Sequence, residues 1–262
     1  MECADGRGAA GGATAAAGLH FPREILSAWI AGRVAQGVEG YIDTKNTADK
    51  ELSAWTPAPV RPECFNHTCN LSYGLTAQHG HQAMKDFVNF LDLINSQFCA
   101  RGMLRLELFL MPATFSGMVG EFITARIPEY CRRVVKNRHH NGHPDLLPFS
   151  KFPEDSVQYA QEGVEVKASR YTSGWQGHNP EAAWLMVFCF NSNTLNERNK
   201  EEYEPRLFRF TGVYAAKLEK SDWSFSGRSV SSRRTIKASI TKSGADKMKD
   251  NWVCKESGEL KR

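Results

Sequence analysis

The segment Gly163-Val164-Glu165-Val166-Lys167-Ala168 alternates apolar with polar side chains, and Trp184-Leu185-Met186-Val187-Phe188-Cys189-Phe190, further along the chain, is apolar throughout. Alternation with a period of two predicts a strand with one buried face. An unbroken apolar run of this length predicts a central strand that is buried on both faces. Residues 143–147 and 207–218 predict two further strands. This part of the chain is therefore expected to form a β-sheet.

Helical periodicity surrounds the predicted strands. Apolar residues recur at helical spacing over 21–38, 87–98 and 119–127, and Pro128 is expected to interrupt the last of these helices. Residues 104–110 alternate and are followed by a proline, so they predict another strand. Together these patterns predict an α/β protein, in which a mixed sheet of about five strands has helices on both faces.

The length of the chain bounds its organisation. With 262 residues and about 150 residues per domain, one or two domains are expected. Residues 1–18 are rich in Gly and Ala without periodicity and predict a disordered tail. We expect residues 19–262 to form one domain, with a helical and irregular part at 19–112, a core at 113–218 and a basic segment at 219–262.

Composition predicts a soluble, cytoplasmic protein. No run approaches the ~18 apolar residues of a membrane span, so no membrane partner is expected. The opening Met1-Glu2-Cys3-Ala4-Asp5 is acidic and lacks the apolar core of a secretory signal. The seven cysteines are odd in number and irregularly spaced, and several lie in apolar runs, as is typical of reduced thiols.

Three residues of the predicted sheet could carry chemistry together. Glu165 and Lys167 are two residues apart on a strand, so their side chains project from the same face. If residues 143–147 form a neighbouring strand, the Asp145 carboxylate can approach Glu165. Two adjacent carboxylates repel each other unless a cation lies between them, and oxygen ligands of this kind suit Mg²⁺. A lysine beside such a metal can orient the attacking water.

On Pro144, Asp145, Glu165 and Lys167, the chain resembles the PD-(D/E)XK nuclease superfamily, whose fold is that of restriction endonucleases. The resemblance implies a central sheet flanked by helices and Mg²⁺-dependent hydrolysis of phosphodiester bonds. Asp145 and Glu165, with the Val166 carbonyl, would hold the metal, and Lys167 would position the water. The expected activity is that of a DNA endonuclease similar to a type II restriction or defence enzyme, with 113–218 as its catalytic core.

The family resemblance also suggests a further acid and an assembly. Many members place a glutamate on the helix before the Pro-Asp strand, and Glu121 matches that position, with Glu129 as a competitor. Many relatives cut double-stranded DNA as homodimers, so duplex DNA and a second copy of the chain are the expected partners.

Other interpretations of the same residues stay open. Glu165 and Lys167 could form a structural ion pair on a solvated face, and the chain would then be a non-catalytic DNA-binding protein. Asp155 is a rival to Asp145, which we prefer because the buried-looking Leu146-Leu147 follows it. The nuclease chemistry is also compatible with RNA or branched DNA as the substrate.

Two segments are candidates for DNA contact. The loop at 173–180 holds amide and imidazole groups that could reach phosphates or base edges, although it could equally be a turn in which Trp175 packs on the core. Residues 217–255 carry ten Lys and Arg against four acids, a surplus suited to phosphate contacts. The candidate DNA-binding residues are Gln176, His178, Asn179, Arg228, Arg233, Arg234 and Lys237.

Two weaker signals involve histidines. Cys64 and Cys69 with His79 and His81 are zinc-capable types, but their spacing fits no common zinc-finger pattern. His139, His140 and His143 precede Asp145, so they could lie near the active site or contact phosphate, although an exposed loop of histidines is the favoured interpretation.

Overall fold

The computed structural model describes residues 50–177, 182–200, 202–225 and 238–256. The predicted tail at 1–18 and the predicted helix at 21–38 lie outside the described residues. The strands are β1 (Val134–Lys136), β2 (Leu146–Pro148), β3 (Val164–Ser169), β4 (Gln176–Gly177), β5 (Trp184–Asn191), β6 (Arg209–Lys217), β7 (Trp223–Phe225), β8 (Ala238–Ile240) and β9 (Trp252–Lys255). The α-helices are α3 (Ala77–Cys99), α4 (Leu106–Phe109), α5 (Pro112–Tyr130), α6 (Leu195–Arg198) and α7 (Lys242–Asp250), and the 3₁₀ turns are η1 (Pro62–Cys64), η2 (Pro153–Asp155) and η3 (Lys220–Asp222).

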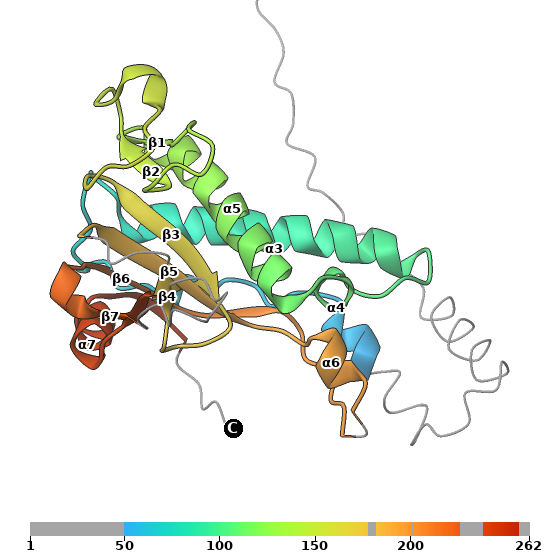
Figure 1. The fold of residues 1–262 in the computed structure, drawn as a ribbon. Helices are drawn as coiled ribbons and strands as arrows, with labels where there is room; N and C mark the ends of the chain where they lie inside the picture. The colour runs from blue at the N-terminus through green and yellow to red at the C-terminus, as the bar shows by residue number, and fades with distance from the viewer. Residues whose placement is uncertain (1–49, 178–181, 201, 226–237, 257–262) are drawn as a thin grey trace, which may run out of the picture.

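The central sheet has six strands in the order β1-β2-β3-β5-β6-β9 (Figure 1). Strands β3 and β5 are parallel and the other neighbours are antiparallel, so the sheet is mixed. The strands predicted at 143–147, 163–168, 184–190 and 207–218 correspond to β2, β3, β5 and β6. The apolar run is indeed central: β5 is buried from Leu185 to Phe190 and lies between β3 and β6.

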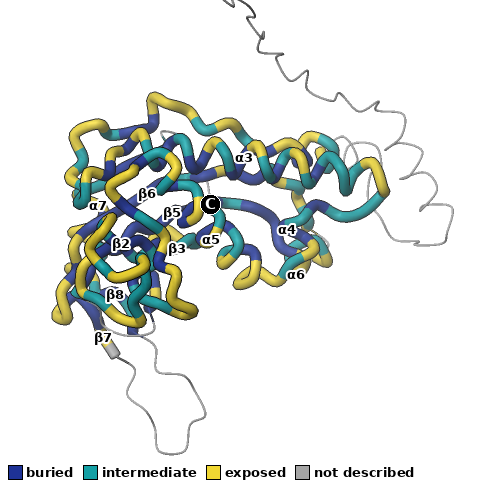
Figure 2. Tube along the Cα trace, turned by 90° about the horizontal axis from the view of Figure 1, so that it is seen from above, coloured by how far each residue is buried: buried dark blue, intermediate teal, exposed yellow. Residues whose placement is uncertain are grey.

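Helices α3 and α5 cover one face of the central sheet, as Figure 1 shows. Their apolar residues recur at helical spacing, so each helix turns one stripe of side chains toward the strands. Phe87 and Leu91 of α3 and Ile123 of α5 are fully buried against Phe188 of β5 and its neighbours. Figure 2 shows this buried layer in dark blue, with exposed residues on the outer turns. Burial of these large apolar side chains is the main stabilisation of the helical face.

The opposite face is covered by α7 together with a second sheet, ordered β4-β8-β7. Trp175, Trp223 and Met248 pack there against Val187 and Tyr214 of the central sheet. The expected helices on both faces are therefore α3 and α5 on one side and α7 on the other, where the small sheet shares the cover. The described part of the basic segment at 219–262 contributes to the core, because β9 pairs with β6 as the edge strand of the central sheet and buries Val253 and Cys254.

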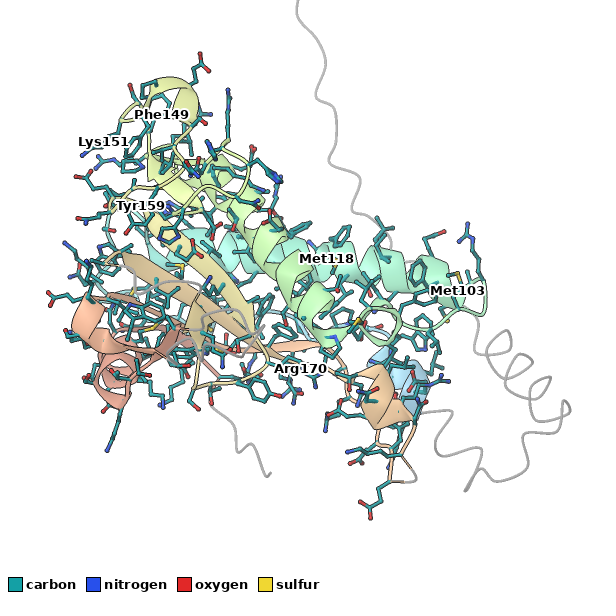
Figure 3. All side chains as sticks on the ribbon, viewed as in Figure 1. Met103, Met118, Phe149, Lys151, Tyr159 and Arg170 are labelled. Atoms are coloured by element: carbon teal, nitrogen blue, oxygen red, sulfur yellow. The ribbon has the colours of Figure 1, made fainter. Side chains whose placement is uncertain are left out.

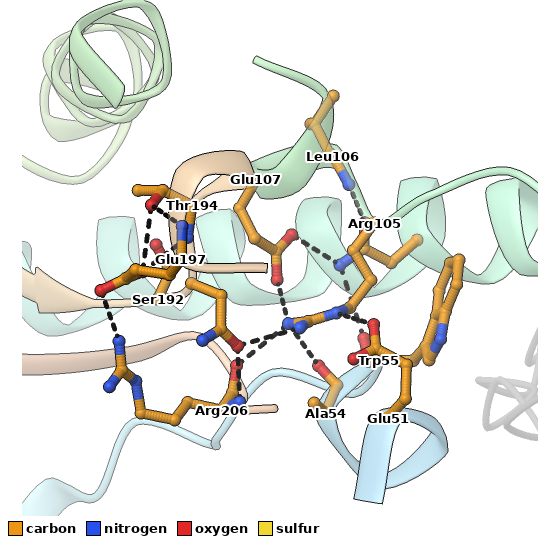
Figure 4. Close-up of polar contacts among 12 residues, drawn as sticks. Glu51, Ala54, Trp55, Arg105, Leu106, Glu107, Ser192, Thr194, Glu197 and Arg206 are labelled. Atoms are coloured by element: carbon orange, nitrogen blue, oxygen red, sulfur yellow. Dashed lines mark hydrogen bonds and ion pairs between the residues drawn. The ribbon is translucent and has the colours of Figure 1, made fainter. Parts of the chain in front are cut away.

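The strand predicted at 104–110 is wrong: this segment contains the short helix α4. Its alternating pattern arises from a buried ion pair, since Arg105 and Glu107 are almost fully buried and Arg105 Nη1 lies 2.8 Å from Glu107 Oε1. Arg105 also contacts Glu51 Oε1 at 3.0 Å and Asn193 Oδ1 at 3.0 Å (Figure 4). Alternation marks a strand only when the polar positions face water, and here they face one another.

The prediction that Pro128 interrupts its helix is also wrong, because α5 continues to Tyr130. A proline removes one backbone N–H donor and crowds the carbonyl four residues earlier. Pro128 lies in the last turn, and the helix is held beyond it by the bond from the Cys131 N–H to the Ile127 carbonyl at 3.0 Å. The helix begins at Pro112, where a proline fits the first turn.

The zinc-capable residues within 64–81 have structural roles. His79 Nδ1 accepts a hydrogen bond from the Thr76 backbone at 3.1 Å, and the His81 ring packs 4.8 Å from that of Phe65. The described cysteines are all free thiols. In the described part of the chain, none of the helices combines the length and apolar character needed to cross a membrane.

Candidate active site

A pocket of about 770 Å³ lies between α5, strand β3 and the loop that joins β1 to β2. It is lined by most of the residues for which the sequence predicted catalysis: Asp145, Glu165, Val166, Lys167 and Glu121. These residues come from three separate elements, namely α5, the chain entering β2, and β3. The structure therefore brings the predicted site residues together in a single depression.

The pairing of β2 with β3 places Asp145 beside Glu165. Leu146 is opposite Val164 in the antiparallel pair, so the residue before Leu146 lies next to the residue after Val164. Both Leu146 and Val164 are buried, which fixes this register, since a slip of one residue would turn apolar side chains to solvent. Asp145 Oδ2 also accepts a hydrogen bond from the Val166 backbone N–H at 2.8 Å.

Glu165 is held at both carboxylate oxygens. Lys167 Nζ lies 2.6 Å from Oε1, and His143 Nδ1 lies 2.8 Å from Oε2. The predicted ion pair between Glu165 and Lys167 is present, but its residues are not on a solvated face: the Glu165 side chain is 12% exposed. His143 is in turn stacked on Tyr159, with ring centroids 5.7 Å apart.

The two carboxyl groups differ strongly in acidity. Burial and the adjacent Glu165 carboxylate raise the pKa of Asp145 to about 7. Burial also raises the pKa of Glu165, but the hydrogen bond from His143 and the charge of Lys167 outweigh this and lower it to about 2. The two shifts have opposite directions, as expected for two carboxyl groups at one point that disfavour simultaneous ionisation.

The donor set at this pocket fits magnesium. Asp145 and Glu165 both line one open pocket with hard carboxylate oxygens, and burial followed by the charge of Glu165 raises the pKa of Asp145, so a cation between the two groups would offset the repulsion. Magnesium commonly takes one or two carboxylates and keeps several waters, for which the pocket has room. The described residues contain no cluster of three or more His, Cys, Asp or Glu arranged for a metal, so waters and substrate would complete the coordination.

Glu121 lines the pocket but bonds elsewhere. Its Oε2 accepts from Lys136 Nζ at 2.7 Å, and both side chains are largely exposed. The competitor Glu129 lies further along α5 and is not part of the pocket lining. The rival acid Asp155 is in η2 and is likewise outside the lining.

Among the predicted DNA-binding residues, Gln176 is described by the structure, and it does not line this pocket. Gln176 is exposed on β4, in the small sheet that covers the opposite face of the central sheet. Trp175 is buried there and donates to the Tyr171 carbonyl at 2.8 Å, which agrees with its alternative role in core packing. The other candidates lie outside the described residues: His178, Asn179, Arg228, Arg233, Arg234 and Lys237.

The interpretation that places His139, His140 and His143 near the active site is confirmed, since all three line the pocket, but the lysine and arginines around them were not among the predicted DNA-binding residues. Residues 131–144 carry four Lys and Arg, three histidines and no acid. Lys136, His139 and His140 line the pocket, and Arg138 next to them is exposed. Figure 3 shows Phe149 and Lys151 nearby, on the same end of the molecule. The absence of acids over this interval is a sequence signal for this surface, although the surplus of basic residues at 217–255 is larger.

Asn137 shapes the loop between β1 and β2. Its buried amide oxygen accepts from the backbone of His139 at 3.0 Å and Val157 at 3.1 Å, and its nitrogen donates to the Pro144 carbonyl at 3.0 Å. A Cβ atom at Gly142 would lie 2.5 Å from the Asn137 amide nitrogen, so a glycine is required for this approach. The loop that carries the histidines to Asp145 is thus tied down by side-chain hydrogen bonds.

Neither a family model, a curated protein nor a solved structure matches this chain significantly.

Proposed function

We propose that the protein is a Mg²⁺-dependent endonuclease that hydrolyses phosphodiester bonds of DNA, on a core like that of restriction endonucleases. The observation that carries the proposal is the convergence of Asp145, Glu165 and Lys167 in one pocket. The central sheet is mixed, and β3 lies inside it with Glu165 and Lys167 on one face. Both features are compatible with that core.

Each residue has a role that follows from its position. Asp145 and Glu165 would hold the metal, with the Val166 carbonyl as a further ligand by family resemblance. When bound, a magnesium ion would supply Lewis acidity toward a phosphate oxygen. Lys167, fixed by its 2.6 Å contact with Glu165, orients the water that attacks phosphorus. The P–O bond to the leaving oxygen breaks and that oxygen takes a proton, leaving 5′-phosphate and 3′-hydroxyl ends by family resemblance.

The charge around the pocket supports a polyanionic substrate. Acids in the pocket would repel a phosphodiester, whereas Lys136 and Arg138, with the neighbouring histidines, offer cations and hydrogen-bond donors at its edge. Contacts of this kind hold the phosphate backbone without reading its sequence. A homodimer on double-stranded DNA and a restriction or defence role belong to the same proposal through the resemblance.

One observation favours a second candidate, a non-catalytic DNA-binding protein. Both oxygens of Glu165 already accept from His143 and Lys167, as in a structural ion-pair network. This reading predicts DNA binding without hydrolysis.

Plasmid cleavage in Mg²⁺ tests the proposal. We expect the wild-type protein to nick or linearise DNA, and Lys167→Met to slow cleavage by about 10²-fold, the scale of losing one oriented or charge-stabilising group. Binding of DNA without cleavage of any tested DNA would favour the second candidate.

A further inference from the structure

The reacting groups lie at the bottom of the pocket. The side chains of Glu165 and Lys167 are 12% and 24% exposed, whereas Lys136 and Glu121, which line the same pocket, are 46% and 69% exposed. The latter pair therefore marks the rim, and its 2.7 Å contact links β1 to α5 across it. A phosphate must pass below this rim to reach the carboxylates.

The two walls of the pocket differ in character. On one side α5 presents Gly117 and Gly120, and a Cβ atom added at Gly117 would meet nothing within 4 Å. On the other side stand His139 and His140, both exposed and carried by the loop that Asn137 secures. Gly117 is exposed and leaves open space on the α5 side, so a flat group has room there in the same pocket that the two imidazole rings line.

The volume limits what the pocket can hold. About 770 Å³ lies within the range of ~300–1,000 Å³ that is typical of small-ligand pockets. That volume suits one or two nucleotides, so an unpaired base can enter beside the reacting phosphate, whereas a base that stays paired in a duplex cannot enter with its partner strand. Unpaired bases are commonly recognised by stacking on aromatic rings, including histidine.

We propose that this pocket takes its nucleic acid as an unpaired strand, with the reacting phosphate at Asp145 and Glu165 and an adjacent base between the Gly117 wall and His139 or His140. The inference rests on the proposed function and specifies its substrate: a single strand, or a duplex that is locally opened at the reacting bond.

Binding in EDTA tests the inference without hydrolysis. The probes are a fluorescein-labelled single-stranded 12-mer and a hairpin duplex that contains the same sequence, compared by fluorescence anisotropy. We expect the single strand to bind about tenfold more tightly than the duplex, and Gly117→Leu to remove about tenfold of its affinity, the scale of one stacked base. Ala125→Leu, at an exposed position of α5 outside the pocket, should change neither affinity.

Folding is controlled within the same series. Leucine is a better helix former than glycine, so Gly117→Leu should keep or raise the melting temperature. The double variant His139→Ala/His140→Ala approaches from the other wall and should weaken single-strand binding with little effect on the duplex. Equal affinity for the two probes, or single-strand affinity unchanged in both variants, would overturn the inference.

Cleavage separates this inference from the proposed function. One result is cleavage of covalently closed duplex DNA by the wild type, with Gly117→Leu cleaving it at the same rate. That result would refute the unpaired-strand inference but would still support the proposed nuclease. The opposite result is a preference for the single strand that depends on Gly117, with no hydrolysis of either probe in Mg²⁺. It would refute the proposed nuclease activity and still support binding of an unpaired strand.

Discussion

His143 Nδ1 lies 2.8 Å from Glu165 Oε2, while Lys167 holds the other oxygen of the same carboxylate. The carboxylate is therefore fixed in rotation by two donors from different elements. His143 itself is fixed by stacking on Tyr159 and by backbone bonds to Gln158 and Ala160. A histidine from the loop before β2 thus positions an acid on β3.

The first prediction concerns this positioning role. His143→Ala should free the Glu165 carboxylate to rotate and weaken Mg²⁺ binding by about 10- to 100-fold, the usual scale for residues that orient a metal ligand. Isothermal titration with Mg²⁺ measures this directly. His143→Asn keeps a donor and should recover part of the affinity. Wild-type affinity in His143→Ala would remove the positioning role.

A second prediction tests the loop that carries the histidines. Gly142→Ala places a Cβ atom 2.5 Å from the Asn137 amide and 2.6 Å from the Val157 carbonyl, so the loop must shift. We expect the free energy of unfolding to fall by about 1–3 kcal/mol, as for overpacked sites. Gly117→Ala is the matched control, because its Cβ meets nothing and helix propensity should stabilise it by up to about 1 kcal/mol. Urea denaturation of both variants gives the comparison, and equal stabilities would contradict the packing argument.

The buried pair Arg105 and Glu107 yields a third prediction. Arg105→Ala leaves the Glu107 carboxylate buried without its cation, which should cost about 3–5 kcal/mol of unfolding free energy. The double variant Arg105→Met/Glu107→Leu removes both charges and should be markedly more stable than Arg105→Ala. Chemical denaturation measures both, and a double variant that is less stable than the single one would refute the account.

A fourth prediction is a pH dependence at Asp222. Burial raises the pKa of this carboxyl, but the hydrogen bond from Lys247 at 2.8 Å and that from the Glu219 backbone at 2.9 Å lower it overall. A lowered pKa in the folded state stabilises the fold above the unfolded pKa, and this stabilisation is lost as pH falls through the folded value. Asp222→Asn should therefore be destabilised relative to wild type at pH 7, and the difference should shrink below about pH 4.

The matched control for Asp222 is Asp246→Asn, which lies exposed on α7. Its unfolding free energy should follow that of wild type at both pH values. If the difference in unfolding free energy between Asp222→Asn and the wild type stays constant between pH 7 and pH 3, the carboxylate charge does not contribute to stability.

The sheet was predictable where periodicity reports burial directly. The apolar run at 184–190 and the alternation at 163–168 each have one reading, and β5 and β3 follow them. The segment at 104–110 misled because its polar positions are buried against one another, which depends on Glu51 and Asn193 from distant parts of the chain. Local pattern cannot reveal partners that only the tertiary fold supplies.

The site was predictable to a similar degree. Asp145, Glu165 and Lys167 could be grouped because strand geometry sets which side chains share a face. The contact of His143 with Glu165 could not, because it depends on the path of the loop fixed by Asn137. Glu121 reaches the pocket but pairs with Lys136, a partner 15 residues away that periodicity does not identify.

The central claim is that the Asp145–Glu165–Lys167 pocket hydrolyses phosphodiester bonds, and end-group analysis of a short labelled DNA in Mg²⁺ tests it most directly. Single-stranded and duplex forms are both supplied to the wild type, Asp145→Asn and Asp155→Asn. We predict products with 5′-phosphate ends from the wild type and from Asp155→Asn, whose side chain is outside the pocket, and cleavage at least about 10²-fold slower from Asp145→Asn. Cleavage by Asp145→Asn at the wild-type rate, or no products from the wild type on either form, would contradict the claim.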